Sequence, residues 1–590
     1  MIQVENLSYG FPTKDLYKNI SFTLEAGQHA AFIGSNGTGK TTLVNLLLHT
    51  DDYLYDGKII KDDSLRIGYV NQFSAHSILD TCTVFEYLSK DYTLNQEKTA
   101  KVCEDMATAE DVEPLFEIYQ NLLDEYEAMD GDNFENNIRK ELYVAGMRDL
   151  ENQPLHLLSG GEYKLLQVMR EMLLQPNLLI MDEPDAFLDF NNLKRLVELL
   201  NHFKGTLLVI THNRFLLNKC FNKILHLENT DIQEFDGSYP EYRCALLRQK
   251  LELKLQANKD LEEIERTEKM VASMRARATA IANASLGRAV HAKQTQLDRL
   301  RTRQIKAPFI ELREPNIVFP ILEDITDDCM INCVEENTTE NVVLKLTDYQ
   351  TGFNDSLLEA INFSLHAGEK VAVVGSNGTG KTTLIRDIMK QGSSNIWINP
   401  DANAVFLSQL QGETLEQSKT VSQIFEDYGI EDKQKMLSIL RDYCLDEALL
   451  GQQVKQLSGG EQNLLQIAII GLTDAKLLIL DEPTSHLDIY AQLALEKALS
   501  EYKGAVFMVS HDYYLINACA DYVLIIEDKS LRKMRNRTFR KMVYEIYFDQ
   551  KYLENDLKKQ ELEMRISKAF QNNDLVTAEK LCEQLESISS

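Results

Sequence analysis

The chain of 590 residues contains two copies of one unit, and this duplication constrains its fold more than any other feature. The segment GSNGTGKTT occurs at Gly34–Thr42 and again at Gly375–Thr383. LSGGE, an apolar run ending in Asp-Glu-Pro and a Thr-His or Ser-His pair then follow in the same order in both halves. Because one hydrophobic core rarely grows beyond about 300 residues, the repeat predicts two homologous domains.

Each glycine-rich loop has the sequence context of a phosphate-binding loop. Apolar, β-favouring runs precede the loops at His29–Ile33 and Val371–Val374, and helix-favouring residues follow them. In a strand–loop–helix unit of this kind, backbone N–H groups surround phosphate oxygens, and the lysine, here Lys40 or Lys381, reaches the β- and γ-phosphates. The loop residues predicted to bind ATP are Gly34, Ser35, Asn36, Gly37, Thr38, Gly39, Lys40, Thr41, Thr42, Gly375, Ser376, Asn377, Gly378, Thr379, Gly380, Lys381, Thr382 and Thr383.

Two carboxylates end an apolar run in each half, LLIMDEP and LLILDEP. Asp182 and Asp481 are predicted to hold Mg²⁺ together with the hydroxyl of the loop threonine. Glu183 and Glu482 follow immediately, where a base can polarise the attacking water. The predicted Mg²⁺ ligands among these residues are Thr41, Asp182, Thr382 and Asp481.

Composition argues for a globular intracellular protein with one unusual segment. No run of about 18 apolar residues and no secretory leader are visible, which predicts no membrane span and a cytoplasmic location. Nine cysteines are scattered without a CxxC pair, so neither zinc nor a disulfide framework is expected. The net charge of −29 disfavours nucleic acid, but Lys269–Lys306 contains nine bases and one acid.

The spacing of the motifs also gives a domain plan with a fold class of α/β. The first half has about 38 more residues than the second between corresponding motifs, placed at about 93–130, where acidic helix-forming sequence predicts an inserted arm. The segment after the first half has almost no Gly or Pro and predicts a hairpin of two long helices with its tip near Asn283–Gly287. The predicted domains are residues 1–240 and 308–530, a linker at 241–307 and a C-terminal helical extension at 531–590.

These motifs together resemble the ATP-binding-cassette ATPases. Two cassettes on one chain, an arm and a charged helical linker resemble the ABC-F class, whose members are ribosome-associated translation factors and antibiotic-resistance ribosome-protection proteins. The resemblance implies a monomer in which the cassettes pair head to tail and bind two ATP. Each ATP would be capped by the other half's signature, formed by Ser159, Gly160, Gly161 and Glu162 or by Ser458, Gly459, Gly460 and Glu461.

The same resemblance assigns further residues of each site. Gln72 and Gln409 match the Q-loops, which sense Mg²⁺ and the attacking water. His212 and His511 match the switch histidines near the γ-phosphate. Phe11 and Phe353 match the aromatic residue that stacks on adenine, with Tyr9 and Tyr349 as nearby rivals.

The basic segment is the predicted nucleic-acid contact. Solvated helices usually mix charge signs, whereas nine bases against one acid favour a polyanionic partner. By resemblance, this partner is ribosomal RNA and the P-site tRNA, and the acidic arm suits a basic ribosomal protein. A solvated hairpin without a partner stays open for both segments. The predicted RNA-contacting residues are Lys269, Arg275, Arg277, Arg288, Lys293, Arg299, Arg301, Arg303 and Lys306.

The two halves differ around the catalytic carboxylates. The second half has DEPTSHLD and Ser-His-Asp where the first has DEPDAFLD and Thr-His-Asn, so Asn213 replaces an acid. We therefore predict that the two sites hydrolyse ATP at different rates, with the first slower. Two other functions are compatible with the motifs: an ATPase subunit of a membrane exporter with a separate membrane partner, and a scaffold that does not hydrolyse ATP. The choice between translation factor and resistance protein stays open.

Overall fold

The computed structural model describes residues 2–11, 14–62, 64–71, 82–109, 111–186, 188–281, 290–297, 314–320, 341–352, 356–390, 394–408, 415–547, 550–572 and 574–589. The chain forms two compact units. The cassette unit contains Met1–Glu234 and Arg313–Tyr547, and the helical unit contains Phe235–Leu312 and Phe548–Ser590.

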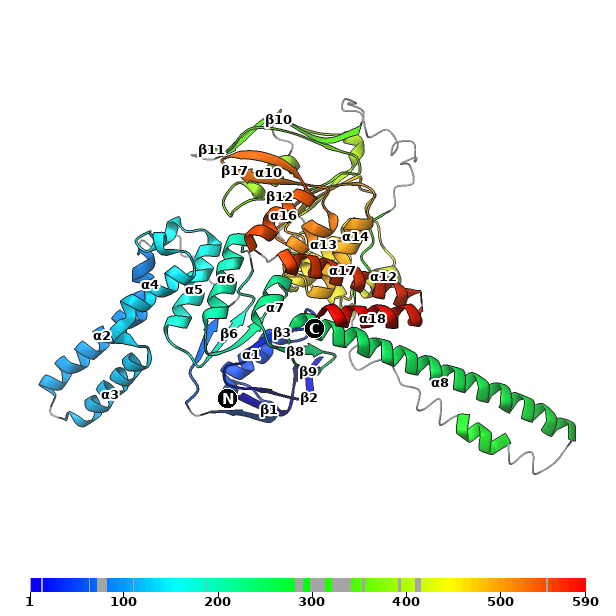
Figure 1. Cartoon of the computed structure of the whole chain (residues 1–590), viewed down its shortest axis with the longest axis horizontal. Helices are drawn as coiled ribbons and strands as arrows, with labels where there is room; N and C mark the ends of the chain where they lie inside the picture. Colours follow the sequence, from blue (N-terminus) through cyan, green and yellow to red (C-terminus); the bar gives the residue numbers. More distant parts are fainter. Residues whose placement is uncertain are drawn as a thin grey trace. The chain divides into compact units, whose positions relative to one another are not determined.

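Each half of the cassette unit is built on a six-stranded sheet and a smaller antiparallel sheet (Figure 1). The first half has the strand orders β5-β6-β7-β3-β8-β9 and β2-β1-β4. Its strands are β1 (Ile2–Phe11), β2 (Lys14–Leu24), β3 (His29–Ile33), β4 (Asp56–Lys61), β5 (Ile67–Val70), β6 (Leu178–Asp182), β7 (Thr206–Ile210), β8 (Lys223–Glu228) and β9 (Asp231–Asp236). Its helices are α1 (Lys40–Leu48), α2 (Val84–Thr108), α3 (Glu113–Ala128), α4 (Phe134–Val144), α5 (Gly160–Leu173), α6 (Phe190–His202) and α7 (Arg214–Cys220).

The second half repeats this plan with the strand orders β14-β15-β16-β12-β17-β18 and β11-β10-β13. Its strands are β10 (Val342–Gly352), β11 (Ser356–His366), β12 (Lys370–Val374), β13 (Ile396–Ile398), β14 (Ala404–Leu407), β15 (Leu477–Asp481), β16 (Ala505–Val509), β17 (Tyr522–Glu527) and β18 (Ser530–Arg535). Its helices are α10 (Lys381–Lys390), α11 (Val421–Asp427), α12 (Lys433–Asp442), α13 (Gly459–Gly471), α14 (Ile489–Glu501), α15 (Tyr513–Cys519) and α16 (Asn536–Tyr547).

The order of the parallel strands places the predicted site residues at one edge of each sheet. Strands β3, β6 and β7 are neighbours in parallel register, and every residue of β6 and β7 is buried. The phosphate-binding loop follows β3, Asp182 ends β6, and His212 follows β7. Since ligands of such sheets bind outside the carboxyl ends of the strands, motifs far apart in sequence meet there. The α/β fold class with two repeated domains is confirmed.

An acidic helical arm extends from the first half, as the sequence predicted. Helix α2 begins with a capping box in which Thr83 and Glu86 exchange hydrogen bonds. Helix α3 packs beside it, and Asn95 Nδ2 donates to the carbonyl of Leu122 at 3.1 Å (Figure 1). No residue of α3 is fully buried, so most of its surface faces solvent.

The helical unit joins the linker to the C-terminal extension. Its helices are α8 (Tyr239–Ile281), α17 (Gln550–Gln571) and α18 (Leu575–Ser589), and residues 290–297 are also helical. Arg275 of α8 donates to Gln294 at 2.9 Å, so residues 290–297 return along α8. The predicted tip, Asn283–Gly287, lies outside the described residues.

The C-terminal helices α17 and α18 pack on the first turns of α8. Their shared apolar cluster contains Cys244, Leu251, Leu562, Ile566, Ala569, Phe570, Leu575, Ala578, Leu581, Cys582 and Leu585. Arg243 pairs with Glu563 at 3.0 Å, and Arg248 pairs with Glu586 at 2.6 Å. The extension is therefore a structural part of the linker base.

The basic stretch at the start of the predicted extension differs from expectation. Residues Ser530–Arg535 form β18, which pairs antiparallel with β17 at the edge of the second sheet, and helix begins only at Asn536. Continuous antiparallel pairing with β17, from Ser530 opposite Glu527 to Arg535 opposite Tyr522, makes this stretch the edge strand of the sheet. Among the described residues, no helix combines the length and apolarity needed to cross a bilayer.

The packing of the C-terminal extension gives a stability prediction. Ile566→Ala removes a side chain with 0% exposure from the cluster with α8, and cavities of this kind cost about 2–5 kcal/mol. Hydrogen exchange should then show faster opening of α8, α17 and α18. The matched change Val576→Ala lies on the same hairpin at 66% exposure and should leave exchange unchanged. Equal exchange in both variants would contradict this packing.

Candidate functional site

The first phosphate-binding loop is closed around its lysine. Lys40 is buried, and its Nζ donates to the carbonyls of Gly34 and Ser35 at 2.9 and 3.0 Å. Gly39 has a φ of 97°, and a Cβ there would lie 2.8 Å from the hydroxyl of Tyr17, so only glycine fits before α1. Burial lowers the pKa of Lys40, against the opposing effect of nearby acids.

The second loop has the same arrangement. Lys381 is buried, and its Nζ donates to the carbonyls of Gly375 and Ser376 at 2.7 and 2.8 Å. Both ammonium groups therefore lie inside loops of inward-facing backbone at the start of a helix. This combination of N–H groups, a helix N-terminus and a cation suits a polyphosphate.

The carboxylates that end β6 and β15 are oxygen donors of the kind that bind hard cations. Thr41 Oγ1 donates to Asp182 Oδ2 at 2.7 Å, so a loop hydroxyl and the strand carboxylate are already in contact. Burial, more than any other cause, raises the pKa of Asp182 to about 6. Asp481 is equally buried at the end of β15. A hydroxyl and a buried carboxylate beside a polyphosphate site fit Mg²⁺, which takes few protein ligands.

Glu183 and Glu482 have a strained backbone at the sheet edge. Their φ angles are 45° and 46°, a left-handed conformation that costs of order 1–3 kcal/mol for residues other than glycine. Their electrostatic surroundings differ. Burial raises the pKa of Glu482 to about 8. Burial also disfavours the charge of Glu183, but His486, His212 and Lys40 outweigh it and lower its pKa to about 2.

The two switch histidines are buried beside these carboxylates. Burial lowers the pKa of both His212 and His511 to about 3, so both imidazoles are neutral. The His511 backbone N–H donates to Glu482 Oε2 at 3.1 Å, and its Nε2 lies 3.6 Å from Glu482 Oε1. Neither imidazole nitrogen of either histidine has a hydrogen-bond partner among the described residues. A phosphate oxygen or a water would satisfy such buried atoms.

Each phosphate-binding loop also bonds to the other half. The Asn36 N–H donates to Asp488 Oδ2 at 3.0 Å, and the Asn377 N–H donates to Asp189 Oδ2 at 3.1 Å. The other oxygen of each aspartate caps the helix that follows it, α14 or α6. The two halves therefore meet head to tail, with each loop facing its opposite half.

The second half's signature lies against the first loop. A Cβ on Gly460 would lie 2.0 Å from Asn36 Nδ2 and 2.6 Å from the His486 carbonyl, so glycine is required by this close approach. Asn36 Nδ2 itself donates to the His486 carbonyl at 2.7 Å. Ser458 and Ser159 each begin their helix with a capping box to the signature glutamate. For the second loop, the contact to the opposite half that the structure defines is the one between Asn377 and Asp189.

His486 gives different surroundings to Glu183 and Glu482, the two carboxylates predicted to be catalytic. Its Nδ1 lies 3.8 Å from Oε2 of Glu183, which belongs to the other half. The backbone of His486 is left-handed, with a φ of 60°. At the repeat offset, the first half has Phe187 in this position, a residue outside those the structure describes. An imidazole therefore reaches the first site from the second half. Sequence reasoning missed His486, although its place between the catalytic Glu482 and Asp488 was a signal.

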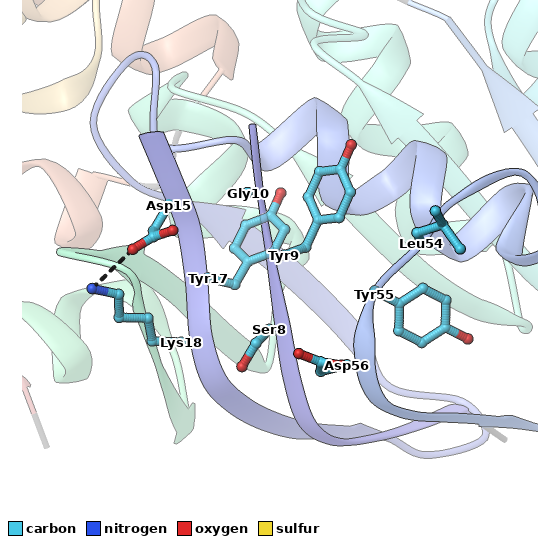
Figure 2. A pocket seen from close by; sticks show the side chains of 9 residues that line it. All are labelled: Ser8, Tyr9, Gly10, Asp15, Tyr17, Lys18, Leu54, Tyr55 and Asp56. Atoms are coloured by element: carbon cyan, nitrogen blue, oxygen red, sulfur yellow. Dashed lines mark ion pairs between the residues drawn. The ribbon is translucent and has the colours of Figure 1, made fainter. Parts of the chain in front are cut away.

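The aromatic residues near the first loop surround an open pocket (Figure 2). Residues of β1, of β2 and of the segment that leads into β4 line a cavity of about 550 Å³, and its aromatic lining residues are Tyr9, Tyr17 and Tyr55. Phe11 lies at the end of β1 with half its surface exposed. Its ring meets the ring of Tyr9 edge-on, with 5.9 Å between the ring centroids. An exposed ring of this kind is able to stack on a base.

Other predicted residues are either in the core or outside the described part. Tyr349, the rival aromatic of the second half, is buried and donates to Asp387 at 2.7 Å, so it is a core residue. Of the predicted RNA contacts, Lys269, Arg275 and Lys293 are described, and Lys269 is highly exposed. The backbone of Arg277 lies in α8. The residues outside the described ranges are Gln72, Gln409, Phe353, Arg288, Arg299, Arg301, Arg303 and Lys306.

Comparisons with known proteins agree with this geometry. A family model described as ABC transporter matches residues 17–186 and 358–485. The ribosome protection protein VmlR of Bacillus subtilis is 27% identical over 551 residues, covering 91% of this chain and 88% of its own. ABC transporter F family member 5 of Arabidopsis thaliana is 27% identical over 556 residues, covering 90% and 75%.

Solved structures show the same fold at low identity. A model of ribosome-bound archaeal Pelota and ABCE1 contains a chain with a TM-score of 0.56 and 17% identity, covering 92% of this chain and 80% of that one. A structure titled RNase-L Inhibitor has a TM-score of 0.54 and 16% identity, covering 92% and 93%. Both share the arrangement of two cassettes in one chain.

The family model matches both halves, so the chain belongs to the ABC transporter family of ATP-binding-cassette proteins. Its twin-cassette relatives place it in the ABC-F class, which the motifs resembled. It is an ATPase that hydrolyses ATP to ADP and phosphate.

The fit of Gly460 predicts the effect of a single methyl group. In a Glu482→Gln chain, where the first site alone can turn over, Gly460→Ala should lower turnover by roughly tenfold or more, because the methyl forces Asn36 and His486 apart. Steady-state phosphate release measures this loss. Gly451→Ala is the control, since nothing lies within 4 Å of the added methyl. Unchanged turnover in Gly460→Ala would contradict the close approach.

Proposed function

We propose that the chain binds two ATP in composite sites between its halves and uses their closure and hydrolysis to act on the ribosome near the P-site tRNA. The observation that carries this proposal is the reciprocal pair of bonds from Asn36 to Asp488 and from Asn377 to Asp189. A nucleotide held by either loop then lies at the interface. The two possible uses of this activity are adjustment of translation and displacement of an antibiotic, and both would depend on the same ATP-driven closure of the halves.

The residues of each site divide the work of hydrolysis. The loop lysine and N–H groups bind the β- and γ-phosphates, and the opposite signature serine and glycines donate to the γ-phosphate. Glu183 or Glu482 orients and polarises the attacking water, and the neutral switch histidine bonds to the γ-phosphate through a nitrogen that is free of protein partners. Mg²⁺, held by the loop threonine and strand aspartate, would neutralise charge on the phosphate oxygens.

The roles of the two glutamines and of the two stacking aromatic residues are proposed mainly from the sequence. Gln72 and Gln409 would complete the Mg²⁺ and water contacts. Phe11 and Phe353 would stack on the two adenines, and the exposure of Phe11 supports its assignment.

Closure follows from differential affinity. A ligand shifts a conformational equilibrium only as far as it binds one state better than the other. ATP contacts both halves only when they are closed, so binding favours closure. Loss of the γ-phosphate removes that bridge and favours opening.

The linker is the proposed contact with RNA. Lys269 and Arg275 lie on α8, and Lys293 lies on the returning helix, so the bases fall on both limbs. Phosphate contacts of this kind position a protein without reading sequence. VmlR is named a ribosome protection protein, which favours the ribosome as the polyanion.

Further parts of the proposal concern the arm and the state of the chain. The arm from Glu97 to Asp130 has eleven acids and two bases, which suits a basic ribosomal protein. The reciprocal contacts join the two halves of one chain, which supports a monomer, and the proposed action on the ribosome would take place in the cytoplasm.

Single substitutions at the catalytic carboxylates test the two sites. Glu482→Gln should lower steady-state ATPase more than Glu183→Gln does, because the first site is the slower one, and the double variant should lose at least about 99% of turnover. Phosphate release at saturating ATP measures all three. Equal losses from the single variants would contradict the asymmetry, and full turnover in the double variant would exclude these carboxylates as the catalytic groups.

Ribosome binding tests the linker. The Glu183→Gln, Glu482→Gln chain with ATP should sediment with ribosomes rather than membranes. Changing Lys269, Arg275 and Lys293 to Gln should weaken ribosome binding. The slope of the logarithm of the binding constant against the logarithm of salt concentration should fall by up to about three, one released counterion for each lost base.

The control for that experiment changes three exposed lysines outside the linker, Lys58, Lys204 and Lys503, to Gln. Equal weakening by both triple variants would show a nonspecific charge effect. Sedimentation with membranes instead would favour the exporter subunit.

A further inference from the structure

Arg214 of the first half is a buried cation whose contacts lie in the second half. Its side chain is 10% exposed. Nη1 and Nη2 both donate to the carboxylate of Glu496, the first at 3.2 Å, and Nη2 lies 3.7 Å from Asp512 Oδ2. The guanidinium also lies over the ring of Tyr514, 4.3 Å from its centroid.

A contact of this kind is energetically demanding. A buried guanidinium is tolerated only where its charge and N–H donors are satisfied, and removing one partner leaves an uncompensated buried charge. Two carboxylates and an aromatic face satisfy Arg214 from three directions.

The position of Arg214 gives this contact a functional meaning. It is the first residue of α7, two residues after the switch histidine His212. Its partner Asp512 directly follows His511, the switch histidine of the second site. Asp512 Oδ1 accepts from the N–H groups of Tyr514 and Leu515, so it also caps α15.

A short chain of contacts therefore runs from Arg214 to the second catalytic carboxylate. Asp512 fixes the end of the loop that contains His511. The His511 N–H donates to Glu482 Oε2 at 3.1 Å. Asp512 and His511 are consecutive residues, so the position of Asp512 constrains where the His511 N–H meets Glu482.

The sequence does not have the residues for the corresponding contact in the opposite direction, from the second half to the first. At the offset of 299, Tyr513 corresponds to Arg214, Asn213 to Asp512 and Val197 to Glu496. Asn213 caps α7 through Phe215 and Leu216 as Asp512 caps α15, but without charge. The difference between Thr-His-Asn and Ser-His-Asp thus matches the cation that Arg214 places opposite the second switch, where the second half has Tyr513 at the corresponding position.

We propose that Arg214 is a positioning residue that the first half supplies to the second ATP site, where it holds Asp512 and through it His511 and Glu482. The inference rests on the assignment of Glu183 and Glu482 proposed above. It makes the second site dependent on the first half's switch, with no equivalent dependence in the other direction.

The sharpest test is Asp512→Asn, which keeps the helix cap, as Asn213 does, and removes only the charge that faces Arg214. In a Glu183→Gln chain, where the second site alone turns over, kcat should fall by about tenfold while KM for ATP changes by less than about twofold. Asp512 and Arg214 should act as a unit. Adding Arg214→Met with Glu496→Gln, which leaves no buried carboxylate stranded, should therefore cause little further loss.

The matched control is the exposed pair of Arg139 and Glu135 on α4, changed to Met and Gln. It removes the same charges from the same chain and should leave kcat unchanged. In a Glu482→Gln chain, where the first site alone turns over, Asp512→Asn should change kcat by less than about threefold.

A second readout needs no turnover and is recorded both without nucleotide and with ATP, because ATP is expected to favour closure of the halves. Trp397 is the single tryptophan, so Trp397→Phe with Tyr513→Trp places one reporter in the buried first turn of α15. Acrylamide quenching of this reporter should rise by about twofold or more when Arg214→Met and Glu496→Gln are added, because the loop loses its anchor.

The results separate this inference from the proposed function. Normal kcat at the second site in Asp512→Asn, or unchanged quenching, would overturn the role of Arg214. If the Glu183→Gln and Glu482→Gln chains show that turnover does not depend on these carboxylates, the proposed sites fail, and quenching alone decides whether Arg214 holds the loop.

Discussion

Two hydrogen bonds that cross between the halves determine where the chemistry of this protein is built. In each, an asparagine N–H of one phosphate-binding loop meets an aspartate, Asp488 or Asp189, of the opposite half. The same aspartate caps a helix of its own half, so the loop is tied to a rigid element rather than to a mobile side chain. Under the proposed function, neither half alone forms a complete site, and ATP binding and the approach of the halves are one event.

The interface is reciprocal in its backbone and asymmetric in its charges. His486 of the second half approaches Glu183 of the first site, and Arg214 of the first half holds Asp512 beside the second. Each site therefore receives a different group from its opposite half. After duplication of one unit, such differences at matched positions give two sites with one fold and distinct electrostatics. We expect this to allow hydrolysis at one site to follow or depend on the other.

The helical unit shows how a basic segment is presented by an acidic protein. The C-terminal hairpin packs on the base of α8 through an apolar cluster and two arginine–glutamate pairs. Among the described residues, these contacts involve α8 from Arg243 to Leu255, and Lys269 and Arg275 lie further along the helix. The basic residues that begin at Lys269, presented on a supported helix, suit a phosphate-rich surface, because the helix is ordered before it binds and loses less entropy on binding.

The repeat, the two P-loops, the switch histidines and the paired carboxylates were predictable from the sequence, because each depends on residue types at fixed local spacing. The helical arm and linker followed from composition and length for the same reason. The place of Gly460 opposite the first loop was expected only from the family resemblance, and the roles of His486 and Arg214 were not predictable. Each of these two roles depends on a partner hundreds of residues away in the sequence. The head-to-tail packing brings the partners into contact, and the shapes of both halves determine that packing. The spacing of residues within one motif contains no information about which residues of the other half it will contact.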